Sequence, residues 1–152
     1  MKPVFICHQL KATAEDPLLA KKQFEANIES VRLICRSLFS STLTPIGVHL
    51  HFPQFMDDNN PEERELGIKY NHILLQHYLL PLQGELWVYG PDEQVWKWHY
   101  APRISEGMAG EIRLCQKLGI PVVCKDPRLR EVLARFLSEL PTAAAPDTSG
   151  RS

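Results

Sequence analysis

Glu111 is the residue whose position in the sequence points most clearly to chemistry. On a helical wheel for residues 105–118, Met108 and Ile112 share one side, and Glu111 falls within this apolar sector. Glu106 falls on the opposite side, where water would solvate its carboxylate. A carboxylate on a buried face costs free energy unless it is hydrogen-bonded or used in a reaction. The pattern therefore predicts either a buried structural carboxylate or a catalytic one.

The start of the same helix offers a second chemical feature. Ser105 is a good N-cap residue, and Gly107 and Gly110 leave the first two turns open to a ligand. Free N–H groups at a helix start suit a phosphate or carboxylate, and Arg103 would add positive charge. We take Arg103, Ser105, Gly107 and Met108 as candidate binding residues. The glycines equally suit close packing of the helix on a sheet, and the segment matches neither a Walker A nor a Gly-x-Gly-x-x-Gly motif.

Three histidines stand at the ends of predicted strands. His8 ends the first strand, and His49 and His51 end the second. Together with Asp57 they include the ligand types of zinc, but His-x-His at a strand end is common without metal. We therefore expect no metal or other cofactor, and favour substrate hydrogen bonding by His8 or His49. The same loop segments contribute the further binding candidates Gln9, Phe52 and Asp57.

An aromatic segment follows the third predicted strand. Residues 91–102 contain Trp96 and Trp98, two of the three tryptophans of the chain. Aromatic side chains beside a site can stack on a base or close over it. They are also enriched at subunit interfaces. The sequence leaves these two roles equally open.

The composition excludes several classes of protein. The chain has 152 residues, with 17 Lys+Arg against 18 Asp+Glu, and 44% of its residues are hydrophobic. One domain of roughly 100–200 residues fits this length. The near-neutral balance argues against a protein that binds long nucleic acids, which would show a basic excess. No apolar run approaches the roughly 20 residues of a membrane span, and the N-terminus lacks a signal-peptide pattern, so we expect a cytoplasmic protein.

The cysteines indicate neither a zinc ribbon nor a redox motif. The four residues are far apart in the sequence and form no Cys-x-x-Cys pair. Each lies in an apolar periodic segment. We interpret them as small buried hydrophobic side chains.

Short apolar runs alternate with helical periodicity along the chain. Asp16, Asn60 and Asp126 each precede a proline, which is the arrangement of an N-cap and a first helical residue. Glu63 stands at the capping-box position of the second helix. The pattern predicts strands at residues 4–7, 43–49, 85–89 and 120–124, with helices at 17–40, from 60, at 105–118 and from 127. In the second helix, the expected inward face holds Leu66, Tyr70, Ile73, Leu74 and His77.

This alternation predicts an α/β fold, a flavodoxin/Rossmann-like three-layer sandwich whose mostly parallel sheet has helices on both faces. Pro45 and Pro121 fall in strand-like segments, and proline is tolerated mainly on edge strands. The strand order 2-1-3-4 places both at the edges. Ligands of such sheets bind beyond the carboxyl ends of the strands, where the candidate residues are expected. We expect the domain to span residues 2–140 and a disordered tail to follow at 141–152.

Taken together, these motifs resemble the nucleoside 2-deoxyribosyltransferase-like superfamily, and most closely a small branch found in bacteria and phages. The resemblance spans about residues 3–124. It is carried by residues 4–8, 45–58, 60–67, 85–90, 104–112 and 117–122.

The resemblance implies specific roles for several residues. In the enzymes of this superfamily, a Gly-x-x-x-Glu pattern opens the helix after the third strand and its glutamate is the nucleophile; Gly107 and Glu111 match this pattern. Attack at the anomeric carbon would give a covalent glycosyl-enzyme. Asp92 would be the acid that protonates the leaving base, and Ser105 with the helix start would hold a 5′-phosphate or 5′-hydroxyl. A homo-oligomer, a dimer or larger, is also implied.

Three hypotheses follow. The first is cleavage of a nucleoside or nucleotide N-glycosidic bond, or deoxyribosyl transfer, through Glu111. The second is a non-catalytic nucleotide-binding or sensing module on the same fold. The third, which ranks last, is metal-assisted hydrolysis that uses His8, His49, His51 and Asp57.

Overall fold

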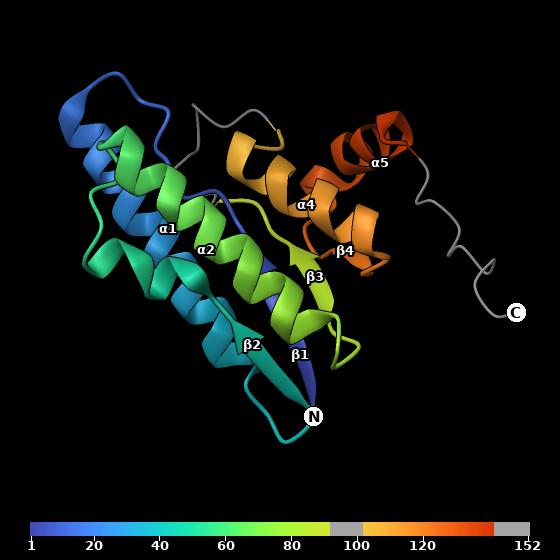
Figure 1. Ribbon diagram of the computed structural model, residues 1–152. Helices are drawn as coiled ribbons and strands as arrows, with labels where there is room; N and C mark the ends of the chain where they lie inside the picture. The colour runs from blue at the N-terminus through green and yellow to red at the C-terminus, as the bar shows by residue number, and fades with distance from the viewer. Residues whose placement is uncertain (92–101, 142–152) are drawn as a thin grey trace, which may run out of the picture.

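Four parallel strands form the centre of the computed structural model, which describes residues 1–91 and 102–141 (Figure 1). The strands are β1 (Lys2–Cys7), β2 (Leu43–Ile46), β3 (Glu85–Val88) and β4 (Val122–Cys124). Their order in the sheet is β2-β1-β3-β4, and every neighbouring pair is parallel. The predicted α/β class and the order 2-1-3-4 are confirmed.

The two prolines lie at the sheet edges as expected. Pro45 is within β2, where its Cα pairs with that of Val4, and β2 has no neighbour on its other side among the described residues. Pro121 lies just before β4, and its carbonyl accepts a hydrogen bond from the Leu86 N–H at 2.9 Å. Because proline lacks an N–H, neither position removes a bond that a central strand would need.

In the described part of the chain, four α-helices flank the sheet: α1 (Pro17–Leu38), α2 (Pro61–Leu79), α4 (Glu106–Leu118) and α5 (Arg130–Glu139). The predicted N-caps are present at Asp16, Asn60 and Ser105, each of which accepts a backbone N–H from the first turn. Asp126 caps a short 3₁₀ turn, Pro127–Leu129, that leads into α5. Figure 1 shows α2 and α4 next to each other, and the two helices are in contact.

Glu63 does not close the predicted capping box. Its Oε1 accepts from the Asn60 side-chain amide at 3.1 Å, and its Oε2 accepts from the backbone N–H of Asp57 at 2.8 Å. A capping box would instead bond the backbone N–H of Asn60. Glu63 therefore connects the preceding loop to the start of α2.

The core lies between the sheet and the α2–α4 pair. Phe5 and Cys7 of β1 and Leu86 and Val88 of β3 are completely buried in one hydrophobic cluster. Residues of the helices complete the cluster, among them Leu75, Leu79, Met108, Ile112 and Cys115. Val4 and Ile6 of β1, which point to the opposite face, are also fully buried. Burial on both faces is what a central strand of a parallel sheet requires.

The inward face of α2 differs from the prediction. Leu66, Tyr70 and Ile73 are 43–52% exposed, and His77 is exposed too; of the predicted set, Leu74 alone packs against the core. The buried residues are Gly67, Asn71, Leu75 and Leu79. This row lies one residue further along the helix, because Gly67 packs against Met56 and Asn71 bonds Glu111 at a cavity.

The second strand is shorter than predicted. After Ile46 the chain enters two 3₁₀ turns, Val48–Leu50 and Phe52–Gln54. Gly47 permits this course close to α1, since a Cβ there would lie 2.7 Å from Val31 Cγ1. His49 is consequently buried in a turn while His51 is exposed, so the two do not share a strand face.

Some predictions fall on residues outside those that the structure describes. These are Asp92, Trp96 and Trp98 in residues 92–101, and nearly all of the predicted tail at 141–152. Cys7 and Cys115 are buried as expected, Cys35 and Cys124 are partly buried, and all four thiols are free. Within the described part of the chain, no helix has the length and apolar character needed to cross a membrane.

Candidate functional site

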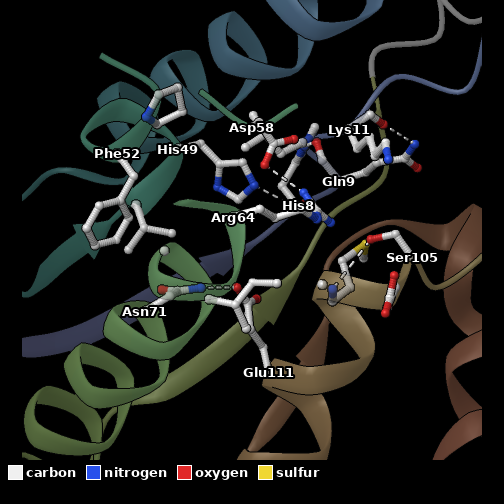
Figure 2. Close-up of a pocket in the computed structure, with 18 of the residues that line it drawn as sticks. His8, Gln9, Lys11, His49, Phe52, Asp58, Arg64, Asn71, Ser105 and Glu111 are labelled. Carbon is white, nitrogen blue, oxygen red and sulfur yellow. Dashed lines mark hydrogen bonds and ion pairs between the residues drawn. The ribbon is translucent and has the colours of Figure 1, made fainter. Parts of the chain in front are cut away.

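A cavity of about 350 Å³ opens at the carboxyl end of β1, between α2 and the start of α4 (Figure 2). Its size is in the range of small-molecule sites. Four parts of the chain line it: residues 8–12 after β1, the 3₁₀ turns after β2, the first half of α2, and residues 103–111. The topology was expected to bring the first, second and fourth of these segments to this end of the sheet, whereas the contribution of α2 was not expected.

Most of the predicted site residues line this cavity. They are His8, Gln9, His49, Phe52, Arg103, Ser105, Gly107, Met108 and Glu111. Asp57 does not: it is exposed and its Oδ1 accepts from the Asn59 N–H at 2.9 Å. The next residue, Asp58, lines the cavity instead. The sequence placed an acidic residue on this loop correctly but could not tell which of two adjacent side chains points inward.

Glu111 is buried, with 5% of its surface exposed. The Asn71 amide donates to Glu111 Oε1 at 2.5 Å, from α2 across to α4, as Figure 2 shows. Its Oε2 is buried and receives no N–H or O–H hydrogen bond from the described residues. Burial raises the pKa of Glu111 to about 7, although the Cys7 thiol and the Asn71 amide favour the ionised form. The carboxyl group is therefore poised between its two protonation states near neutral pH.

Asn71 is the main residue of the candidate site that the sequence analysis missed. It is 8% exposed in the middle of α2, at i+4 from Gly67 on the same buried face. An asparagine in a helix interior is unfavourable because its side chain competes with the backbone for hydrogen bonds. That unfavourable position was the available signal. The apolar row of Leu66, Tyr70 and Ile73 obscured it.

His8 and His49 form a second polar group in the cavity. His49 Nε2 donates to the His8 carbonyl at 2.8 Å, and His8 Nδ1 donates to the Gln9 carbonyl at 2.7 Å. The rings meet edge to face, with centroids 6.0 Å apart. Burial lowers the pKa of His49 to about 3 and also lowers that of His8, which the carbonyls of Gln9 and Gly90 only partly offset. Both imidazoles are therefore neutral at pH 7.

Charged side chains surround the cavity on two sides. Arg64 of α2 donates to Asp58 Oδ1 at 2.7 Å, and both side chains are largely buried. Lys11 and Arg103 lie at the mouth and are exposed. Glu106 is also exposed and lines the cavity, so the opening carries charges of both signs, while the carboxyl group of Glu111 lies deeper.

The start of α4 leaves space for a ligand. Ser105 Oγ accepts from the Met108 N–H at 3.4 Å and so fixes the first turn. A Cβ built on Gly107 would meet no atom within 4 Å, although Gly107 lines the cavity. The protein itself does not need glycine there for packing. The open space favours the ligand interpretation of this glycine over the packing interpretation.

The structure does not assemble the proposed metal ligands. His51 and Asp57 are exposed and do not line the cavity, unlike His8 and His49. Among residues 1–91 and 102–141, no group of three or more His, Cys, Asp or Glu side chains is arranged to hold a metal ion.

The chain that leads toward Asp92 is anchored at β4. The Gly90 N–H donates to Asp126 Oδ2 at 3.0 Å, and Arg128 donates to the Pro91 carbonyl at 2.8 Å. Arg128 also pairs with Asp126 at 2.6 Å. These contacts fix residues 90 and 91 at the carboxyl end of the sheet, which is the end where the cavity lies.

Comparison with known proteins gives a family and no activity. No curated protein and no solved structure matches the chain. The likeness to nucleoside 2-deoxyribosyltransferases thus stays a prediction from the motifs. Residues 2–125, most of the chain, match the family model described as a domain of unknown function, and the protein therefore belongs to the DUF7768 family.

Proposed function

We propose that the protein cleaves the N-glycosidic bond of a nucleoside or nucleotide, or transfers the glycosyl group, with Glu111 as nucleophile. The single observation that carries this proposal is the environment of Glu111. A carboxyl group at the base of a ligand-sized cavity has one oxygen held by Asn71 and the other without an N–H or O–H partner. Buried carboxyl groups with perturbed pKa values in a cavity are typical of catalytic sites.

The proposed reaction has two steps. A carboxylate oxygen of Glu111 attacks the anomeric carbon, the bond from that carbon to the base nitrogen breaks, and the base leaves with its bonding electron pair and a proton. Water, or a second base, then attacks the anomeric carbon of this ester, the bond to the Glu111 oxygen breaks, and Glu111 leaves as a carboxylate. The incoming group gives its proton to the group that protonated the first base, which restores the starting state. The resemblance assigns Asp92 as the proton donor to the leaving base, and this role remains a proposal.

Asn71 and Cys7 would keep the nucleophile ionised. Each interacts with the charged form of Glu111, while burial opposes it and raises the pKa to about 7. Attack requires the carboxylate, so kcat/KM for base release should rise as the pH increases through about 7.

Base release tests the proposal. Ribo- and deoxyribonucleosides and their 5′-monophosphates are incubated with the protein, and free base is separated and quantified. Glu111→Gln keeps the size of the side chain but removes the nucleophile, so we expect base release to fall at least about 10³-fold. Glu131→Gln, a matched change on the exposed first turn of α5, should leave the rate unchanged. Base release that survives in Glu111→Gln would rule out this nucleophile.

A second candidate function is binding without turnover. It is favoured by the pKa of Glu111, because a carboxyl group that is partly protonated at neutral pH can serve as a neutral hydrogen-bonding group. Nucleotide binding by the wild type with no base release from any substrate in the panel would support this candidate over catalysis.

The remaining expectations concern surroundings and assembly. Four free thiols suit a reducing compartment, which supports a cytoplasmic location. A formal net charge of −1 supports a small ligand rather than a long nucleic acid. The homo-oligomer implied by the resemblance stays a prediction, and the molar mass in solution measured by light scattering tests it.

A further inference from the structure

Four buried polar atoms around the cavity have no hydrogen-bond partner among the described residues. They are His8 Nε2, His49 Nδ1, Asn71 Oδ1 and Glu111 Oε2. All four residues line the cavity, and each is more than nine-tenths buried. A buried polar atom without a partner costs about 1–3 kcal/mol, and native structures contain few. Four around one cavity indicate that something else occupies their hydrogen-bonding positions.

Three of the four atoms are acceptors in the neutral side chains that carry them, and the fourth, Glu111 Oε2, is an acceptor when the carboxyl group is ionised. A carbonyl can only accept, so His49 Nε2, which bonds the His8 carbonyl, must carry the proton. In a neutral imidazole the other nitrogen, Nδ1, then has a lone pair. The same reasoning leaves a lone pair on His8 Nε2, since His8 Nδ1 bonds the Gln9 carbonyl. Burial lowers the pKa of both rings and so keeps them neutral.

The other two acceptors belong to the pair at the base of the cavity. Asn71 uses its amide nitrogen on Glu111 Oε1, so its Oδ1 remains. Glu111 Oε2 in the carboxylate form is an acceptor as well. These four atoms can therefore accept hydrogen bonds from donors of a bound ligand. Water can donate hydrogen bonds to such acceptors, and a ligand that takes the place of water must bring its own donors.

We propose that these acceptors bind the hydroxyl groups of a pentose and that the protein selects ribosyl over 2-deoxyribosyl ligands. The position of the sugar rests on the function proposed above, with the anomeric carbon at Glu111. The carbon that bears the 2′-hydroxyl is bonded directly to the anomeric carbon. Its O–H therefore comes next to the Glu111–Asn71 pair, where two acceptors have no partner. A 2-deoxy sugar would leave them unpaired in a site from which water has been displaced.

General properties of hydrogen-bonding sites give the expected preference for ribose over 2-deoxyribose. A site built to hydrogen-bond a substrate hydroxyl rejects an analogue that lacks it far more strongly than an apolar pocket discriminates by size. In retaining glycosidases, contacts to the 2-hydroxyl strengthen in the transition state. We expect at least about tenfold tighter binding of the ribosyl ligand, which corresponds to a single net hydrogen bond.

Binding of two sugar phosphates tests the proposal without requiring catalysis. D-Ribose 5-phosphate and 2-deoxy-D-ribose 5-phosphate are titrated into the wild-type protein by calorimetry. Neither contains a glycosidic bond to a base, so the ratio of the two Kd values reports recognition of the 2-hydroxyl alone. The expected ratio is at least about tenfold in favour of ribose.

Two variants locate the recognition. Asn71→Leu removes one of the two unpaired acceptors beside the 2-hydroxyl and should lower the ratio, mainly by weakening the ribose ligand. Gln76→Leu makes the matched change on the exposed side of α2 and should leave the ratio as in the wild type. The wild-type comparison needs no variant, so it remains decisive if Asn71→Leu fails to fold.

The outcomes separate this proposal from the proposed function. Equal or tighter binding of the deoxy sugar would overturn the ribosyl preference, even if base release through Glu111 is observed. Ribose-selective binding without base release from any substrate would support the preference and contradict the catalytic role. Failure of both sugars to bind at millimolar concentration would overturn the pentose site itself.

Discussion

Helices α2 and α4 face each other across the cavity but build their inner faces from different chemistry. α4 buries Met108, Ile112 and Cys115, with Glu111 as one polar residue among apolar neighbours. The cavity half of α2 buries Gly67 and Asn71, while its apolar residues at 66, 70 and 73 face outward. The difference is that α4 supplies a buried carboxyl group within the core, whereas α2 supplies space and an amide that bonds this carboxyl group.

The largest expected effect is a difference in the free energy of unfolding between substitutions on the two faces of α2. Leu75 is completely buried, whereas Leu66 is 49% exposed. Leu75→Ala should lower the free energy of unfolding by about 2–5 kcal/mol because it leaves a cavity in the core. Leu66→Ala should change it by less than about 0.5 kcal/mol. Urea unfolding measures both, and similar losses would mean that the helix is rotated from the orientation described.

The sequence predicted the buried face of α4 but not that of α2, because different side chains pack against the two helices. The wheel placed Glu111 correctly because α4 packs on the sheet with an ordinary apolar stripe, and Ser105 marked its start. On α2 the same reasoning failed, since Gly67 and Asn71 are inward for reasons that appear only when Met56 and Glu111 are placed beside them.

The strand order could likewise be predicted from the sequence, whereas the turns after β2 could not. Proline is tolerated mainly on edge strands, so Pro45 and Pro121 indicated which two strands lie at the edges, and the predicted order 2-1-3-4 is confirmed. The 3₁₀ turns that bury His49 depend on the close approach of Gly47 to Val31, which is a tertiary contact. Local signals therefore predicted the elements, and contacts between distant residues decided the details of the site.

The second prediction concerns the single buried carboxyl group of α4. Its pKa is about 7 in the folded protein against an ordinary value of 4.5, so ionisation on folding is unfavourable. Below about pH 4.5 both folded and unfolded forms are protonated and no cost arises. As the pH rises from 4.5 to 7 the unfolded form ionises first and stability falls, reaching a constant loss above pH 7.

Glu111→Gln does not ionise and should avoid this loss. Its advantage over the wild type should be small at pH 4, grow between pH 4.5 and 7, and reach up to about 3 kcal/mol at pH 8. Denaturant unfolding at each pH measures it. An advantage that does not depend on pH would show that Glu111 is not desolvated, and the contrast between the two helices would weaken.

The smallest expected change in the free energy of unfolding comes from replacing one glycine in each helix by alanine. Gly107→Ala of α4 places its Cβ in open space and should stabilise the fold by about 0.5–1 kcal/mol. Gly67→Ala of α2 places its Cβ 2.3 Å from Met56 Cε, so the methionine must move and the gain should be lost. Thermal unfolding ranks the two variants.

Ligand binding then sharpens the same comparison. Because the space at Gly107 is part of the cavity, Gly107→Ala should weaken nucleotide binding although the fold is more stable. A variant that is stabilised and binds as the wild type does would show that the ligand does not approach the start of α4.

The central claim is that Glu111 becomes covalently attached to the sugar. The protein is mixed briefly with substrate, quenched in acid, and examined by intact mass and by peptide mapping. We expect a mass increase of one glycosyl group, located on the peptide that contains Glu111 and absent from Glu111→Gln. Base release by the wild type with no adduct, or with the adduct on another residue, would contradict the account.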